Sequence, residues 1–332
     1  MVLSDSLALK SSFEESGIQV CVKPLPRDYR FGKHAETLRP LIDSIRPSII
    51  HSSLFHADMI LRYLDTSAKK VTGLVSAMYS DGRLNRLPWL TRKKVWVLKH
   101  WDTWTSSKID AFIANSNTIR SHYIQDLGYE PEKVNVIFRG RRIKSSNSVV
   151  QRKENQLVFI GRLIPSKGLE TAIKAFEKLS RIHPCLIFKI AGEGPERPYL
   201  MQLIQELGLE NKVILLGQVS HVNALLAESA LFIFPTHYEG LPGALIEAML
   251  AKIPIICSDI PENRECVDES MALFHRVGDA ADLVAQMQKA LILSDWEART
   301  QKAFDFAVAH FDIEKIVRQY ENVYRELLTD PG

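Results

Sequence analysis

The sequence predicts an α/β protein with two doubly wound parallel sheets, and three observations indicate this class. Short apolar runs closed by turn residues alternate with segments whose apolar residues recur at helical spacing. The apolar runs are continuous, which is typical of parallel strands that are covered on both faces. The chain has 332 residues, which is enough for two hydrophobic cores.

The C-terminal half carries the more regular pattern. A helix is predicted over 169–179, and a second helix ends near Gly208, a residue typical of the position after a helix. A long amphipathic helix is predicted over 312–328. Strands are predicted over 157–160, 186–191, 213–216, 231–234 and 254–257.

The N-terminal half repeats this order more loosely. Strands are predicted over 18–22, 49–51, 71–75, 111–114 and 134–138. Helices are predicted over 34–45, 56–64, 91–107 and 117–126. Residues 139–156 are polar and basic and predict a linker. We therefore expect an N-terminal domain at 1–150, a C-terminal domain at 151–311 and a terminal helix at 312–332.

Charge and cysteine content limit the partners and the compartment. Residues 1–150 contain 23 Lys and Arg against 14 Asp and Glu, which gives +9, and the remainder carries −6. The basic half is therefore expected to meet an anionic partner. The four cysteines show no CxxC spacing, which favours reduced thiols in a cytoplasmic protein over a zinc or redox site. Neither a signal peptide nor a membrane span is predicted.

The strongest motif is the segment 236–249, which reads THYEGLPGALIEAM. A Gly-rich loop follows a predicted strand and leads into a helix with Pro242 near its first turn. Free N–H groups and the helix dipole make such a helix start an anion site suited to a diphosphate. Glu239 lies in the loop and Glu247 lies within the helix. One carboxylate is therefore expected at the helix mouth, and the other is suited to a vicinal diol.

Two further glycine-containing loops follow neighbouring strands. The segment 161–168, GRLIPSKG, places Arg162 and Lys167 at another helix start. Cations there neutralise charge that develops on a departing diphosphate. The segment 192–195, GEGP, leaves room for a flat base, although Gly and Pro after a strand are also ordinary turn residues. Each charged residue alone could be a solvated surface group, but the combination at one sheet edge favours function.

Together these motifs resemble the family 4 retaining glycosyltransferases, also called glycosyl transferases group 1, from about residue 158 to the C-terminus. The resemblance implies the GT-B fold, in which two Rossmann-like doubly wound domains face each other across a cleft. It also implies that the last helix crosses back to the N-terminal domain. Family members need no metal at this site, and the sequence contains no acidic DxD pair.

The same resemblance assigns roles to the motif residues. Arg162 and Lys167 would hold the donor diphosphate. Glu247 would hold the ribose hydroxyls, and Glu239 would contact the transferred sugar as part of the catalytic set. Glu265 also fits a family position, with a structural role at a helix start as the alternative. The other implied donor contacts are Gly161, Gly194, Val219, Gly240, Leu241, Pro242 and Gly243.

The N-terminal half departs from the family pattern. The usual Asn-Gly after the strand near 134–137 is Arg139-Gly140 here. The family's first strand and Gly-rich loop have no counterpart, so the N-terminal domain is expected to lack its first strand-helix unit. Either the true start lies upstream or the enzyme is shortened. His51 and Tyr79 are candidate acceptor-side residues, although a strand-end histidine is more often structural.

One segment, 86–104, holds four of the five tryptophans together with several cations. Tryptophan and cations at helical spacing are typical of a helix that lies on an anionic bilayer. The alternative is an acceptor-domain helix with Trp inside and Lys outside. The excess of positive charge in the same half favours peripheral contact with the inner face of a membrane.

The sequence therefore predicts a retaining hexosyltransferase without a metal cofactor. The donor is a nucleotide diphosphate sugar, with a UDP-sugar favoured and a GDP-sugar as the alternative. The acceptor is a hydroxyl of a glycan or a lipid-linked saccharide in cell-surface polysaccharide biosynthesis. Two other hypotheses are a GT-B nucleotide-sugar epimerase and a non-catalytic nucleotide-sugar-binding subunit. No motif supports a nucleic-acid partner.

Overall fold

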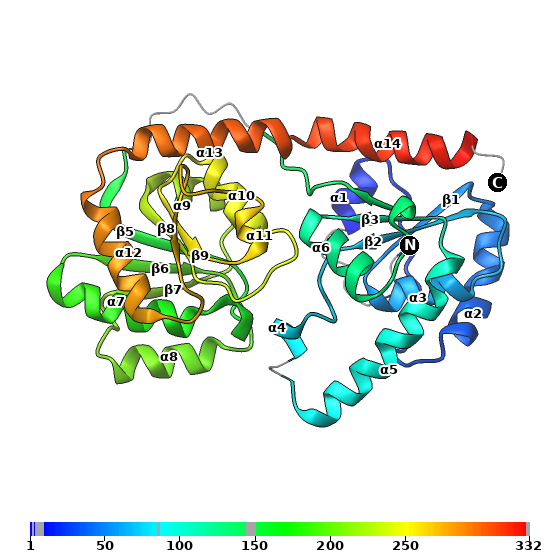
Figure 1. Ribbon diagram of the computed structural model, residues 1–332, viewed down its shortest axis with the longest axis horizontal. Helices are drawn as coiled ribbons and strands as arrows, with labels where there is room; N and C mark the ends of the chain where they lie inside the picture. Colours follow the sequence, from blue (N-terminus) through cyan, green and yellow to red (C-terminus); the bar gives the residue numbers. More distant parts are fainter. Residues whose placement is uncertain (2, 4–9, 85–86, 144–150, 330–332) are drawn as a thin grey trace.

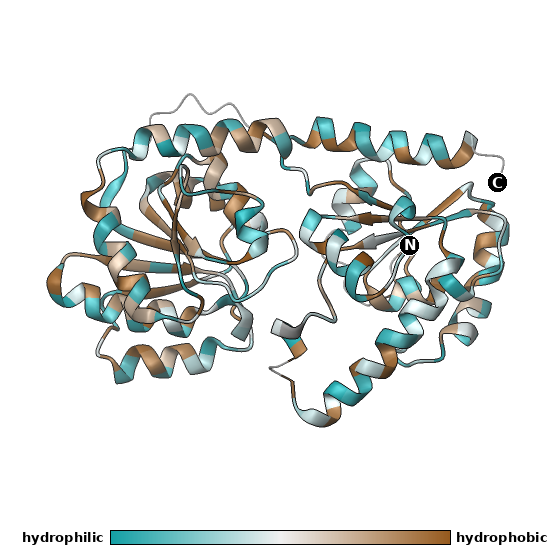
Figure 2. Ribbon diagram, viewed as in Figure 1, coloured by the Kyte–Doolittle hydropathy of each residue, from teal (hydrophilic) through white to brown (hydrophobic). Residues whose placement is uncertain are grey.

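The computed structural model describes residues 1, 3, 10–84, 87–143 and 151–329. These residues form two parallel sheets with helices around each, and the last two helices of the chain run end to end along both halves (Figure 1). The predicted α/β class with two Rossmann-like parallel units is confirmed. Apolar residues predominate in the strands of the C-terminal sheet (Figure 2).

The N-terminal sheet has four strands in the order β1-β2-β3-β4, and every pair is parallel. Its strands coincide with four of the five that the sequence predicts for this half. The strands are β1 Ile49–Ser53, β2 Lys69–Leu74, β3 Ala111–Ala114 and β4 Val134–Val136.

One N-terminal helix, α2, packs an apolar stripe into the N-terminal core. In α2 the buried residues Phe31, Ala35, Leu38 and Ile42 follow helical spacing, which explains why this segment forms a helix. The helices are α1 Lys10–Glu15, α2 Phe31–Ile45, α3 Phe55–Tyr63, α4 Asp81–Leu84, α5 Trp89–Thr105 and α6 Asn117–Ser121. Single turns η1 Ser106–Lys108, η2 His122–Asp126 and η3 Pro131–Lys133 complete this half.

The C-terminal sheet has six parallel strands in the order β10-β9-β8-β5-β6-β7. Strand order reverses between β5 and β8, and ligands of doubly wound sheets bind beside the carboxyl ends of strands at such a point. The strands are β5 Lys153–Ile160, β6 Ile187–Ala191, β7 Val213–Gly217, β8 Ser229–Phe234, β9 Ile255–Ser258 and β10 Leu273–His275.

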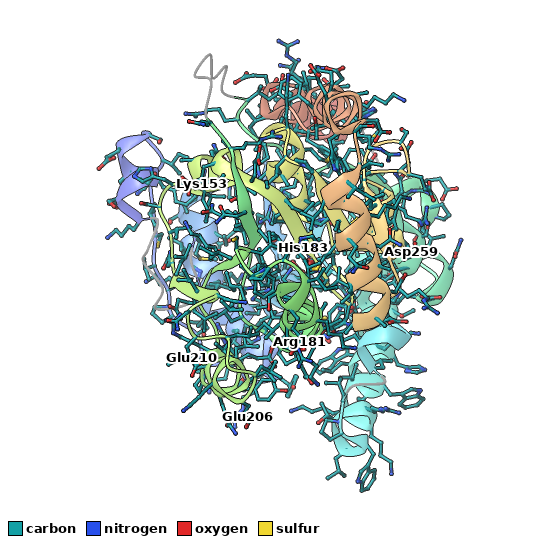
Figure 3. The ribbon with its side chains drawn as sticks, turned by 90° about the vertical axis from the view of Figure 1, so that its left-hand side faces the viewer. Lys153, Arg181, His183, Glu206, Glu210 and Asp259 are labelled. Atoms are coloured by element: carbon teal, nitrogen blue, oxygen red, sulfur yellow. The ribbon has the colours of Figure 1, made fainter. Side chains whose placement is uncertain are left out.

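Helices cover both faces of this sheet and enclose one continuous apolar cluster. Figure 3 looks at the outer end of this half. There Lys153, His183 and Glu210 lie at or just before the starts of β5, β6 and β7, so the strands point toward the N-terminal sheet. The helices are η4 Pro165–Lys167, α7 Leu169–Ile182, α8 Arg197–Glu206, α9 Val222–Glu228, α10 Gly243–Leu250, α11 Pro261–Arg264, α12 Ala280–Ile292 and α13 Trp296–His310.

The last helix, α14 Ile313–Thr329, packs on the N-terminal sheet. Its residue Ile316 is buried against Val71, Ile113 and Ile137. Figure 1 shows α13 and α14 end to end along one side of the molecule. The chain therefore returns from the C-terminal half to the N-terminal half at its end.

Three local predictions differ from the structure. The stretch 18–22 belongs to neither sheet, because its apolar residues find no continuous strand ladder among the described residues. The predicted linker is shorter than 139–156, because β5 already begins at Lys153; residues 144–150 of that linker lie outside the described residues. β10 is too short, at three residues, to stand out in the sequence.

Candidate functional site

The loops after β5 and β8 meet where the strand order reverses. Lys167 ends the single turn η4, and its ammonium group contacts the carboxylate of Glu239 in the loop after β8. These two side chains are 13% and 12% exposed, so the pair is shielded but reaches the surface. The Lys167 Nζ atom also lies 5.5 Å from the centre of the Phe234 ring. Two residues chosen from the sequence are therefore direct partners.

A buried threonine holds the carboxylate of this pair in place. The hydroxyl of Thr236 lies 2.8 Å from Glu239 Oε1 and 3.1 Å from the carbonyl oxygen of Ser166. Thr236 is fully buried, so its hydroxyl needs these partners. The backbone N–H of His237 also donates to Ser166, at 2.8 Å. Sequence reasoning assigned Thr236 no role, although its place directly after a buried strand was a usable signal.

Gly168 allows the two loops to approach so closely. Its φ angle is +64°, and a Cβ atom there would lie 2.0 Å from the carbonyl oxygen of Pro235. Any side chain would therefore push the start of α7 away from the end of β8. This close approach explains why the residue after Lys167 is a glycine.

The start of α10 forms the second part of the site. Pro242 occupies the N-cap position, and no side chain caps the first turn, so its N–H groups lack side-chain partners. Leu241 and Pro242 are buried, which leaves the main chain rather than their side chains to face a ligand. Glu247 lies one turn into the helix and is 28% exposed. Its Oε1 atom accepts a hydrogen bond of 2.9 Å from Arg141 Nε.

Main-chain contacts join the ends of β5, β6 and β7. The N–H of Gly161 donates to Ala191 at 3.0 Å, and the N–H of Gly192 donates to Gly217 at 2.8 Å. A Cβ atom on Gly194 would lie 2.3 Å from the carbonyl oxygen of Leu163. The glycines thus allow the main chains at three strand ends to pack closely together.

Two predicted residues lie apart from the Lys167–Glu239 pair. Arg162 follows Gly161 in the same loop and is exposed, so its guanidinium is accessible to an anion. Val219 lines an open hollow of about 490 Å³ beyond β7, together with Gln218, His221 and Glu228. The contacts of the described residues do not bring Val219 to Glu247.

Burial affects the acid next to the pair. Glu262 of α11 is 7% exposed, and its Oε1 atom lies 3.5 Å from the backbone N–H of Glu239. Burial, followed by repulsion from Glu239 and Glu265, raises the pKa of Glu262 above its usual value. Glu262 was not predicted from the sequence.

The loop at Gly240 also touches the N-terminal half. Its carbonyl oxygen accepts a hydrogen bond of 3.2 Å from Ser116 Oγ, and a Cβ atom there would lie 2.1 Å from the carbonyl oxygen of Val75. Val75 and Ser116 follow β2 and β3, so loops beyond the carboxyl ends of both sheets meet here.

The two acceptor-side candidates do not join these residues. His51 lies within β1, and its Nδ1 atom is 2.6 Å from the hydroxyl of Tyr324 on α14. Tyr79 is 2% exposed and donates a hydrogen bond of 2.7 Å to Asp102 Oδ2. Both side chains therefore have hydrogen-bond partners within the fold. The sequence pattern near a strand end does not distinguish such a contact from a place in a pocket.

Two further observations concern metals and membranes. Among the described residues, no three His, Cys, Asp or Glu side chains are grouped so that they could hold a metal ion. Within the same part of the chain, no helix combines the length and apolar character that a membrane crossing requires.

The fold defines a class: two Rossmann-like units of GT-B architecture. A solved structure with this fold is that of HepE from Anabaena in complex with UDP and glucose. It is 21% identical, covers 98% of this chain and 90% of that chain, and superposes with a TM-score of 0.80.

Two family models place the chain more closely. The model described as "Glycosyltransferase Family 4" matches residues 4–143, and the one described as "Glycosyl transferases group 1" matches 141–303. The chain belongs to the family 4 glycosyltransferases, as the sequence motifs predicted.

Curated relatives align over the greater part of this chain. The phosphatidylinositol N-acetylglucosaminyltransferase GPI3 subunit of Saccharomyces cerevisiae is 25% identical over 70% of this chain and 54% of its own length. The capsular polysaccharide biosynthesis glycosyltransferase CapH of Staphylococcus aureus is 27% identical over 65% of this chain and 61% of its own. The chain spans about half the length of the curated relatives it matches.

Proposed function

We propose that this protein transfers a hexose, with retention, from a nucleotide diphosphate sugar to a hydroxyl of a glycan or lipid-linked acceptor. A UDP-sugar is the favoured donor, and the pathway is cell-surface polysaccharide biosynthesis. The observation that carries the proposal is the contact of Lys167 with Glu239 where the strand order reverses, beside the uncapped start of α10. Complexes of HepE with UDP support the choice of base.

The proposed division of labour follows the two sheets. Residues 1–150 form the acceptor-side domain, residues 151–311 bind the donor, and the terminal helix 312–332 ties the second to the first. The contact of Gly240 with Ser116 supports an arrangement in which acceptor and donor meet between the two sets of loops.

Cations and helix N–H groups would drive departure of the nucleotide. Arg162 and Lys167 would neutralise the charge that builds on the diphosphate as the bond to the sugar breaks. The main chain of Gly240 and Gly243, at the start of α10, would donate to phosphate or sugar oxygens. In this site Lys167 exchanges its partner: it leaves Glu239 for a phosphate oxygen.

The two carboxylates would hold the two ends of the donor. Glu239, released from Lys167, would accept hydrogen bonds from hydroxyls of the transferred sugar. Glu247 would accept them from the ribose diol. Retention is the outcome that membership of family 4 implies. Gly161, Gly194, Leu241, Pro242 and Val219 complete the proposed donor contacts.

Slow hydrolysis of the donor tests the proposal without an identified acceptor. The purified chain is incubated with a UDP-α-hexose, and proton NMR follows the released nucleotide and the first sugar anomer formed. We expect UDP and the α anomer, because water replaces the acceptor on the same face. Release of the β anomer would contradict retention.

The epimerase and the binding-subunit hypotheses predict different products in the same experiment. An epimerase would release a sugar with an inverted ring carbon, whether or not an acceptor is added. A binding subunit would release no nucleotide while still binding UDP. Either result would overturn the proposed transfer.

We also propose that α5 rests on an anionic bilayer. Trp89, Trp96 and Trp104 are 64%, 62% and 74% exposed, and Lys93 Nζ lies 4.7 Å from the centre of the Trp89 ring. Figure 1 shows the first turns of α5 projecting beyond both sheets, and Figure 2 shows apolar and polar residues mixed along it. Exposed tryptophans beside cations are suited to the headgroup region. Arg86 of the predicted segment lies outside the described residues.

Sedimentation with vesicles tests this contact. We expect the protein to pellet with phosphatidylglycerol-containing vesicles and not with phosphatidylcholine alone. The double variant Trp96→Ser/Trp104→Ser should lose most of this binding. Tyr199→Ser is the matched control, because Tyr199 is an exposed aromatic on α8 of the other half. Equal binding by the double variant would contradict the proposal.

A further inference from the structure

We infer that Arg141, in the connection between the two sheets, is a positioning residue of the donor site. Its guanidinium holds one oxygen of Glu247, so that the other oxygen is presented to the ribose diol of the nucleotide. The inference rests on the proposed function. It adds a residue at a position where the motifs predicted none.

The contact itself is direct. Arg141 Nε donates to Glu247 Oε1 at 2.9 Å, and Arg141 Nη1 donates to the carbonyl oxygen of Gly140 at 3.1 Å. The Arg141 and Glu247 side chains are 22% and 28% exposed. The pair therefore lies at the wall of the site, where a ligand can reach the second carboxylate oxygen.

The main chain fixes the position from which the arginine side chain extends. The N–H of Arg141 donates to Phe311 at 2.7 Å, and its carbonyl oxygen accepts from Ile313 at 3.0 Å. A Cβ atom on Gly140 would lie 2.5 Å from the Ile313 side chain, so glycine is required for this close approach. Removal of the Arg141 side chain leaves both main-chain bonds in place.

The location of the guanidinium argues against a role in helix stability. Arg141 Nη2 lies 2.1 Å from the place where a Cβ atom on Gly243 would be, which puts a cation against the first residue of α10. The start of a helix carries positive partial charge and disfavours a cation. Glu247 balances that cation, and the helix by itself would gain nothing from it.

A fixed carboxylate suits a diol. A carboxylate has two oxygens and accepts on both, whereas a vicinal diol supplies two donors within a short span. If Arg141 holds Oε1, the plane of the carboxylate is set before the nucleotide arrives, and less rotational freedom is lost on binding. This gain in binding free energy is confined to ligands that carry the ribose hydroxyls.

Calorimetric titration with two nucleotides tests this role. The probes are UDP and 2′,3′-dideoxy-UDP, and the variants are Arg141→Ala, Arg141→Lys and, as control, Arg142→Ala. Arg142 is the next residue and is exposed. We expect Arg141→Ala to raise the Kd for UDP about tenfold, in the range of one charge-assisted hydrogen bond. The Kd for the dideoxy compound should not change, and Arg141→Lys should recover part of the loss.

Each other outcome overturns the inference in a recognisable way. Equal weakening of both nucleotides by Arg141→Ala would assign the residue to the phosphates or to the connection itself. No weakening would remove it from the site. Failure of the unchanged protein to bind any UDP would instead overturn the donor site, and this inference with it.

Discussion

Thr118 donates two hydrogen bonds to the carboxylate of Glu265, from its backbone N–H at 3.0 Å and from its hydroxyl at 2.9 Å. Thr118 lies in α6 of the N-terminal half, and Glu265 follows α11 of the C-terminal half. Asn117 donates to the other carboxylate oxygen from its side chain at 2.8 Å. One carboxylate therefore caps a helix start across the interface between the two halves.

We expect Glu265→Ala to loosen this interface. The loss of hydrogen bonds to a charged acceptor is worth about 2 kcal/mol at a half-buried position. The radius of gyration from small-angle scattering should increase, and the Thr118 amide should exchange about 30-fold faster. Glu269→Ala is the control, since Glu269 pairs with Arg264 of its own half. An unchanged amide exchange rate would mean that Glu265 does not hold the halves together.

The pair of Lys167 and Glu239 leads to a prediction in which UDP affinity and the rate of donor cleavage change in opposite directions. Glu239→Gln removes the carboxylate that competes with phosphate for Lys167, so UDP should bind about threefold more tightly. The rate of donor cleavage should nevertheless fall about 100-fold, because the sugar loses its partner. Calorimetry measures the first effect, and nucleotide release measures the second.

The matched variant is Lys167→Met, which should weaken UDP binding about tenfold. If both variants weakened UDP binding equally, the two side chains would serve as one structural unit, and the proposed partner exchange would be wrong.

A variant of Tyr79 tests whether this residue contributes to the stability of the fold or to turnover. Its hydroxyl donates to Asp102, and Asp102 also pairs with Arg62 at 2.7 Å in the buried core. Tyr79→Phe should lower the free energy of unfolding by about 2 kcal/mol, as for a buried hydrogen bond to a charged group. Urea denaturation measures this change, and UDP binding should be unaffected. A stable variant with impaired turnover would instead restore the acceptor-side role predicted from the sequence.

Asp58 predicts a pH dependence of stability. Burial raises the pKa of this carboxyl from 3.8 to about 8, against the smaller effects of Ser52 and Arg62, which lower it. Between those two pH values the folded state holds a proton that the unfolded state lacks. The free energy of unfolding therefore falls as the pH rises through this window.

The isosteric variant Asp58→Asn has no such proton. From pH 5.5 to pH 8, the wild-type protein should lose about 3 kcal/mol more of its unfolding free energy than the variant does. Urea midpoints at the two pH values provide the comparison. Parallel pH profiles would show that Asp58 is ionised in the folded protein.

Periodicity predicted most of the fold because its strands are buried. The runs that became β3 and β8 are continuous and apolar, and each is fully or nearly fully enclosed. The stretch 18–22 is equally apolar at its ends but has no strand ladder, and a strand exists only with a neighbour.

The site was predictable only where each of its residues lies in a recognisable motif. Lys167 and Glu239 come from two motifs at the ends of adjacent strands, and they meet. Arg141 was missed because its partner Glu247 lies far along the chain and no spacing rule connects them. The hydrogen bond of Tyr79 with Asp102 could not be predicted, because no spacing rule connects the two residues in the sequence.

The most direct test of the donor site is calorimetric titration of the purified chain with UDP, GDP and ADP, alongside Arg162→Ala and Glu247→Ala. The account predicts that UDP binds at one site and that each variant weakens it at least tenfold, through the diphosphate and the ribose respectively. Absence of binding by all three nucleotides, or unchanged UDP binding in both variants, would contradict it.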